Sequence, residues 1–231
     1  MILVRDLHSP LPSLVAAFQQ QGIPLARITL VDTGSSAPAC LAELGRLEGL
    51  GCVWHRLAPA EQAFGPYAPW LSFGLSRQLR RNNEPFLVTD ADLFFPDSLP
   101  SDWLEKLFAA LNTHRFAAKT SLPLRTSDIT VAQRERIVSH EQALMLHPAY
   151  RLLTTVLLWR HPGHVACTTD TTLSLYRPGR HFSTLSVRLP LPYALSHLPW
   201  YQTFIDTDEF QYYVSHKLSL FGEWSSLQAH G

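Results

Sequence analysis

Residues 85–96, Pro85-Phe86-Leu87-Val88-Thr89-Asp90-Ala91-Asp92-Leu93-Phe94-Phe95-Pro96, place a short apolar run directly before two carboxylates. A run of this length that is rich in Phe, Leu and Val is typical of a buried strand. Alternate residues of an extended chain point to the same side, so Asp90 and Asp92 are expected to converge on one ligand. Carboxylate oxygens suit Mg²⁺ or Mn²⁺, especially where phosphates complete the shell. The stretch therefore predicts a site for a metal ion and a diphosphate.

The Asp-x-Asp pattern is weak by itself, because short motifs recur by chance. A second copy, Asp206-Thr207-Asp208, has no comparable apolar strand before it. The alternative interpretation of residues 85–96 is a strand that ends in a solvated acidic turn, with Asp97 or Ser98 capping the next helix. Both interpretations stay open on the local residues alone.

The segments before this stretch alternate between strand and helix patterns. Strands are expected at residues 2–4, 27–31, 52–55 and 86–89, and helices at residues 11–21, from Pro38 through Leu47, and at residues 70–81. This alternation indicates right-handed βαβ units and a parallel sheet. Ligands of such sheets bind at the carboxyl ends of the strands. Asp32 ends one expected strand, so it should share one edge with the Asp90 and Asp92 pair.

The second half of the chain is less regular. Helices are expected at residues 102–112, around 132–146 and near 208–217, and strands at 116–119 and, as one continuous strand, at 165–176. Neither an internal repeat nor a linker interrupts the sequence. We therefore expect a single α/β domain over residues 1–231.

The composition excludes several classes of protein. The 231 residues are 46% hydrophobic and 11% aromatic, and the 19 Lys and Arg balance the 19 Asp and Glu, which argues against a general nucleic-acid binder. Three scattered cysteines predict neither a zinc site nor a disulfide framework and favour a reducing compartment. The first residues do not read as a secretory signal, and no apolar run reaches the length of a membrane span. We expect a cytoplasmic protein without a transmembrane span, and leave open peripheral contact with the inner membrane face.

Three stretches of the chain resemble the GT-A nucleotide-sugar glycosyltransferases, particularly small bacterial ones near the family 2 type. These are residues 28–36 (Ile-Thr-Leu-Val-Asp-Thr-Gly-Ser-Ser), the DxD-like residues 86–96, and residues 196–201 (Ser-His-Leu-Pro-Trp-Tyr). The resemblance implies a GT-A, Rossmann-like, mostly parallel sheet flanked by helices. It also implies a nucleotide-binding half at residues 1–97, and a half at 98–231 that binds the acceptor and carries a C-terminal metal and diphosphate segment.

The resemblance assigns the metal site to three residues. Asp92 is the leading direct ligand of Mn²⁺ or Mg²⁺, and Asp90 reaches the ribose, or the metal through a water. His197 supplies a third ligand. The alternative for His197 is a buried histidine that is bonded to the backbone.

The resemblance also assigns residues to the nucleotide and to catalysis. Asp32 and Thr33 are expected to contact the nucleoside, and Gly65 and Tyr67 to pack against the base. Asp170, in a Thr-Thr-Asp-Thr-Thr segment, is the candidate general base that removes the proton of the acceptor hydroxyl. Asp170 is equally well read as a strand-edge residue that binds its neighbouring hydroxyls.

The expected function is a metal-dependent hexosyltransferase that moves a sugar from a nucleoside-diphosphate sugar to a hydroxyl acceptor on a glycan, a lipid or a small molecule. A sugar-nucleotide nucleotidyltransferase is an alternative, but residues 5–10 (Arg-Asp-Leu-His-Ser-Pro) lack its glycine-rich phosphate loop. A phosphatase with an Asp-x-Asp nucleophile would carry that motif early in the chain. The remaining alternative is a non-catalytic protein with the same fold that binds nucleotide sugars.

Overall fold

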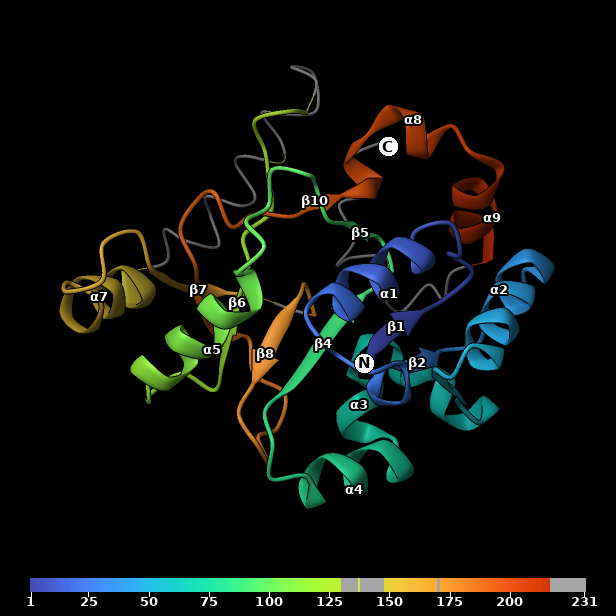
Figure 1. Cartoon of the computed structure of the whole chain (residues 1–231), viewed down its shortest axis with the longest axis horizontal. Helices are drawn as coiled ribbons and strands as arrows, with labels where there is room; N and C mark the ends of the chain where they lie inside the picture. Colours follow the sequence, from blue (N-terminus) through green and yellow to red (C-terminus); the bar gives the residue numbers. More distant parts are fainter. Residues whose placement is uncertain (130–136, 138–147, 170, 217–231) are drawn as a thin grey trace. The chain divides into compact units, whose positions relative to one another are not determined.

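The computed structural model describes residues 1–129, 137, 148–169 and 171–216; strands and helices alternate as far as residue 90, whereas residues 165–197 hold strands in succession (Figure 1). The strands are β1 (Ile2–Val4), β2 (Thr29–Asp32), β3 (Val53–Arg56), β4 (Phe86–Asp90), β5 (Leu93–Phe94), β6 (Lys119–Ser121), β7 (Val165–Thr168), β8 (Ser174–Tyr176), β9 (Leu185–Arg188) and β10 (Ser196–His197). The α-helices are α1 (Leu11–Gln20), α2 (Pro38–Gly49), α3 (Ala68–Leu71), α4 (Phe73–Arg81), α5 (Trp103–Thr113), α7 (Pro148–Leu157), α8 (Gln202–Ile205) and α9 (Asp208–His216). Short 3₁₀ helices are η1 (Leu25–Arg27), η2 (Pro59–Tyr67) and η3 (Leu198–Trp200).

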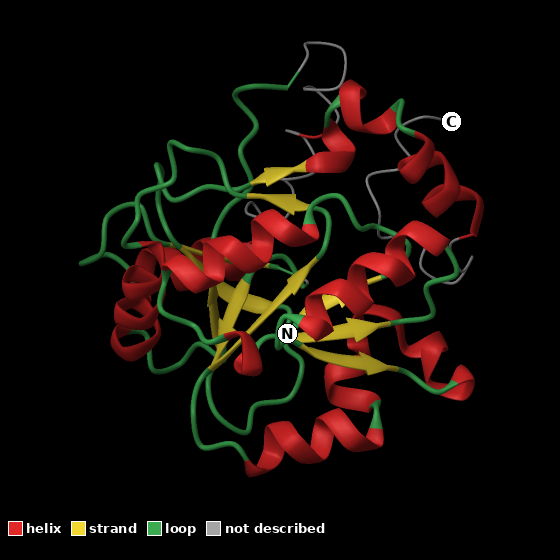
Figure 2. Cartoon of the chain, turned by 45° about the vertical axis from the view of Figure 1, so that its right-hand side comes forward, coloured by secondary structure: helices red, strands yellow, loops and turns green. Residues whose placement is uncertain are grey.

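The described strands form two sheets, which Figure 2 shows in yellow between red helices. The larger has eight strands in the order β3-β2-β1-β4-β8-β6-β9-β7, and β5 pairs with β10 in the smaller. The predicted α/β class, with a sheet flanked by helices, is confirmed. The described residues fold into two compact units: unit 1 comprises residues 1–81, 89–95 and 197–216, and unit 2 comprises the described residues of 82–88 and 96–196. The predicted halves at residues 1–97 and 98–231 stay a prediction.

Unit 1 contains the parallel strands that the sequence predicts. β1 pairs in parallel with β2 on one side and with β4 on the other, and β2 pairs in parallel with β3. All residues of β1 and β2 are buried, as expected for parallel strands covered on both faces. α1 confirms the helix expected at residues 11–21, whereas the helix expected at 70–81 is split, because Ser72 adopts an extended conformation between α3 and α4.

Unit 2 continues with mixed strand directions. β8 runs antiparallel to both β4 and β6, β6 pairs in parallel with β9, and β7 pairs antiparallel with β9. Buried Ala117, Leu158, Ala166 and Val187 form one apolar cluster of this unit. β7 and β8 therefore run in the same direction, antiparallel to β6 and β9, which lie between them in the sheet.

The prediction of one continuous strand at residues 165–176 is wrong. The segment forms β7 and β8, which lie at separate positions in the sheet. Between them, the Thr169 carbonyl accepts a hydrogen bond from the buried Lys119 ammonium at 2.6 Å, and the Thr169 amide donates to Thr184 at 2.8 Å. These tertiary bonds redirect a chain whose local pattern reads as one strand. The helix expected at residues 132–146 lies outside the described residues, apart from position 137.

No helix in the described part of the chain is both long enough and apolar enough to cross a membrane.

Candidate metal and nucleotide site

The strand order of unit 1 creates a place where a ligand can bind. β1 lies between β2 and β4: the connection after β1 leads to β2 on one side, whereas β4, which follows β3 in the chain, lies on the other side. In open α/β sheets this is the switch point, and ligands bind outside the carboxyl ends of the strands there. The residues that follow these ends are Arg5 and Asp6 after β1, and Ala91 and Asp92 after β4.

The structure brings Asp92 and His197 together, although 105 positions separate them. The pairing of β5 with β10 sets the register, and the Leu198 amide donates to the Asp92 carbonyl at 2.9 Å. The His197 Nε2 atom lies 3.1 Å from the Asp92 Oδ2 atom, and both side chains are less than one-fifth exposed. The Trp200 ring meets His197 edge-on, with centroids 5.0 Å apart, and so fixes the plane of the imidazole.

One oxygen of Asp92 is left without a hydrogen-bond donor, as are Asp6 Oδ2 and Asp32 Oδ2 among the described residues. Asp92 Oδ1 is buried and has no hydrogen-bond partner among the described residues. A buried carboxylate oxygen without a donor is costly, so such an atom indicates a place for a cation or a polar ligand. Asp92 Oδ2 and His197 Nε2 share a hydrogen bond of 3.1 Å, and an octahedral ion with bonds of about 2.1 Å, whose neighbouring ligands lie about 3.0 Å apart, could replace it without moving the two groups far. These residues therefore fit a divalent metal.

The Asp32 carboxylate, unlike that of Asp92, accepts hydrogen bonds from backbone amides. Its Oδ1 atom accepts hydrogen bonds from the Gly34 amide at 3.0 Å and from the Ser35 amide at 2.6 Å, and its Oδ2 atom lies 3.6 Å from Arg56 Nε. The Thr33 hydroxyl donates to the Val4 carbonyl at 3.1 Å. Both residues thus shape the loop after β2 in addition to any contact with a nucleoside, and their predicted contact stays a prediction.

Asp6 completes this loop from the neighbouring strand. Its backbone has a φ of 53°, which is uncommon for a residue with a side chain. Its Oδ1 atom accepts hydrogen bonds from the Ser36 amide at 2.6 Å and the Ala37 amide at 2.7 Å, directly before α2. Asp6 therefore anchors the two residues that lead into α2 from outside that helix.

Helix α9 contributes residues that the sequence reasoning missed. Burial, together with the charges of Asp92 and Asp90, raises the pKa of the Tyr213 phenol, so this group is a protonated donor at neutral pH. The Tyr212 hydroxyl lies 3.1 Å from Ser36 Oγ, and Arg5 donates to the carbonyls of Thr33 at 2.7 Å and His216 at 3.2 Å. Tyrosines at positions 212 and 213 of an amphipathic segment give no sequence signal that separates them from ordinary packing residues.

The remaining predicted residues occupy different settings. Asp90 is half-buried at the end of β4, opposite Leu3 of β1. Gly65 has a φ of 48° at a kink in η2, and Tyr67 is half-buried at the start of α3. Their predicted contacts with ribose and base stay predictions. Asp170 lies outside the described residues.

Comparisons with known proteins add little. No protein-family model matches the chain, and no curated protein matches it either. Among solved structures, the crystal structure of S. aureus TarS 1-349 aligns with 99% of this chain and 75% of its own, at 11% identity and a TM-score of 0.47. A likeness at this level carries no argument about activity, so the function has to be argued from the site itself.

Proposed function

We propose that the chain is a glycosyltransferase that uses a divalent metal to move a sugar from a nucleoside-diphosphate sugar to a hydroxyl acceptor. The observation that carries the proposal is the Asp92 and His197 pair at the switch point, with one Asp92 oxygen buried and without a described hydrogen-bond partner. The resemblance of residues 28–36, 86–96 and 196–201 to the GT-A type supports the same reaction.

Charge is the chemical problem at such a site. Transfer of the sugar leaves a nucleoside diphosphate, and negative charge grows on its oxygens. A Mn²⁺ or Mg²⁺ ion held there supplies Lewis acidity toward the leaving diphosphate. The Asp92 carboxylate and the His197 imidazole are the groups that would hold this ion.

Other residues of unit 1 would orient the donor. Arg5 follows β1 directly, and its guanidinium is fixed by the carbonyls of Thr33 and His216, so its charge is preorganised after the carboxyl end of β1. Tyr213 would donate a hydrogen bond, because its phenol stays protonated at neutral pH. We assign Asp90 to the ribose or to a metal-bound water.

The nucleoside and the acceptor complete the proposal. Asp32 and Thr33 would contact the nucleoside from the loop after β2, and Gly65 with Tyr67 would pack against the base. Asp170 remains the proposed general base for the acceptor hydroxyl.

The test is release of nucleoside diphosphate from a panel of sugar nucleotides, measured with Mn²⁺ and with EDTA. We expect metal-dependent release, and a decrease of about 100-fold or more in Asp92→Asn, which loses preorganised charge at the reacting groups. His197→Gln should weaken binding of Mn²⁺ and nucleoside diphosphate in calorimetry.

The second Asp-x-Asp motif offers the matched control. Asp206 is exposed and accepts a hydrogen bond from Gln202 at 2.7 Å, so Asp206→Asn should retain full activity. Metal-dependent binding without turnover of any sugar nucleotide would favour the non-catalytic alternative. Absence of both binding and turnover, or equal activity in Asp92→Asn and Asp206→Asn, would refute the proposal.

A further inference from the structure

Three histidines of unit 2 come together from two distant segments. His114 follows α5, and His161 and His164 lie between α7 and β7. Each offers one ring nitrogen such that the three nitrogens all lie within 4.8 Å of one another. His114 is buried, and the other two are half-buried. None of these residues belongs to the site around Asp92.

A tight turn holds two of the three rings. The His164 amide donates to the His161 carbonyl at 3.1 Å, with Pro162 and Gly163 between them. Gly163 has a φ of 87°, and proline followed by a glycine with positive φ is the signature of a type II turn. A Cβ atom at Gly163 would lie 2.7 Å from Pro190 Cβ, so the turn is also packed against its surroundings. The backbone therefore presents His161 and His164 in a fixed relation.

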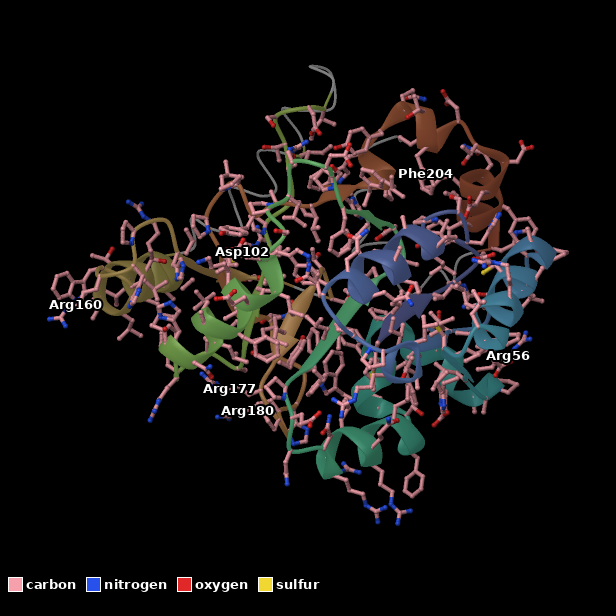
Figure 3. The ribbon with its side chains drawn as sticks, viewed as in Figure 1. Arg56, Asp102, Arg160, Arg177, Arg180 and Phe204 are labelled. Atoms are coloured by element: carbon pink, nitrogen blue, oxygen red, sulfur yellow. The ribbon has the colours of Figure 1, made fainter. Side chains whose placement is uncertain are left out.

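The end of α5 holds the third ring. The His114 amide donates to Ala110 at 2.9 Å, and the Ala117 amide donates to the His114 carbonyl at 2.9 Å. The Arg177 guanidinium, labelled beside α5 in Figure 3, donates to the carbonyls of Leu111, His114 and Ala117. The backbone at His114 is therefore as constrained as the turn that faces it.

We propose that His114, His161 and His164 form a binding site for a transition-metal ion of the Zn²⁺ class. Imidazole nitrogens suit zinc, copper, nickel and cobalt, whereas Mg²⁺ and Mn²⁺ prefer oxygen ligands. Three histidines leave a fourth tetrahedral position for water or another ligand. The nitrogens of tetrahedral zinc lie about 3.3 Å apart for bonds of about 2.0–2.1 Å. The three nitrogens lie within 4.8 Å of one another, so the half-buried His161 and His164 rings would have to rotate to reach this spacing.

The protonation of the three imidazole rings is compatible with metal binding. Burial, and then the neighbouring His164 and His161, lowers the pKa of His114 to about 4, and burial also lowers the pKa of His164. Neutral imidazole is the form that binds a metal. His114 Nε2 and His164 Nδ1 lie 2.8 Å apart and share a hydrogen bond, which the metal would replace with two coordinate bonds. Arg160 precedes His161 in the sequence and follows α7. Its guanidinium carbon lies 4.5 Å from the centroid of the Trp159 ring, on which it stacks (Figure 3).

The alternative is a hydrogen-bonded histidine cluster that only packs. The rings make edge and stacked contacts, with centroids 4.7 Å apart for His114 and His161 and 5.8 Å apart for His161 and His164. A packing cluster predicts unchanged metal affinity when a half-buried ring is replaced, whereas a metal site predicts a large loss.

The experiment is calorimetric titration with Zn²⁺ alone, in the full chain carrying Asp92→Asn to remove the other candidate metal site. A parallel titration with Co²⁺ tests for tetrahedral coordination, which the visible absorption of the bound ion reports. We expect one equivalent of Zn²⁺ to bind. His161→Gln and His164→Gln should each weaken binding by more than about 100-fold, because even outer-sphere partners of a ligand are worth 10–100-fold.

The matched control is His181→Gln, since His181 is exposed in the same unit and should leave the affinity unchanged. Circular dichroism of each variant verifies that it is folded. The proposal is overturned if Zn²⁺ does not bind, or if folded His161→Gln and His164→Gln bind it as tightly as His181→Gln does.

Discussion

Replacement of Asp6 by alanine should destabilise the protein strongly. α2 begins at Pro38, and its N-cap residue Ala37 has no side chain that can cap the helix. Asp6 Oδ1 instead anchors the entry to the helix by accepting hydrogen bonds from the Ser36 amide at 2.6 Å and the Ala37 amide at 2.7 Å. Asp6→Ala therefore removes the acceptor for both amides.

The magnitude follows from these contacts. Hydrogen bonds to a charged group contribute about 1.5–3 kcal/mol each, so loss of two costs about 3 kcal/mol at the low end. Alanine at a φ of 53° adds strain, for which about 1 kcal/mol is the expected scale. We expect Asp6→Ala to lower the free energy of unfolding by about 3–4 kcal/mol.

Asp6→Asn is the matched control. Asparagine keeps an acceptor oxygen for the two amides and tolerates a positive φ, so it should cost only about 1 kcal/mol. Urea unfolding followed by circular dichroism measures the free energy of each variant. If Asp6→Ala and Asp6→Asn are equally stable within the error of the measurement, the role of Asp6 in anchoring the entry to α2 is refuted.

Two further predictions concern stability. Burial raises the pKa of the Cys40 thiol to about 12, so the folded state keeps a proton that the unfolded chain loses above pH 9. The contribution of Cys40 to the free energy of unfolding should therefore be fully present below pH 9 and be lost as the pH rises toward 12. In urea unfolding, Cys40→Ala should reduce this dependence of the free energy on pH, and an unchanged dependence would contradict the effect of burial on Cys40. Arg177→Met should lower the free energy of unfolding by about 2–4 kcal/mol, because three carbonyls at and after the end of α5 lose their hydrogen-bond donor. Arg180→Met, at the exposed neighbour labelled in Figure 3, should have no measurable effect, and equal melting temperatures for the two variants would contradict the role of Arg177.

The parallel part of the fold could be predicted from the sequence for a simple reason. Strands buried on both faces need consecutive apolar residues, and residues 2–4 and 86–88 supply them. The pattern around residues 165–176 misleads, because a Thr-rich segment fits an extended chain throughout. Its division depends on Lys119, which is distant in sequence and donates to the Thr169 carbonyl at 2.6 Å.

The candidate sites were predictable to different degrees. Asp92 and His197 lie 3.1 Å apart as the resemblance implies, but no spacing rule relates residues that are 105 positions apart. His161 and His164 carried a signal that sequence reasoning passed over, since Pro162-Gly163 predicts a turn that brings them to one side. Their approach to His114 depends on tertiary packing, which the sequence pattern does not show.

The acidic residues at the carboxyl edge of unit 1 separate into two groups by what their oxygens already bind. Asp6 and Asp32 each direct one oxygen at two backbone amides of the loop at residues 34–37, so part of their charge is already compensated by the fold. Asp92 has no such amide, and its nearest described polar partner is an imidazole at 3.1 Å. A carboxylate whose charge the fold leaves uncompensated attracts a cation more strongly than one already bonded to amides. This difference explains why one edge of a sheet can carry several aspartates of which Asp92 is suited to hold a metal, while Asp6 and Asp32 build the loop beside it.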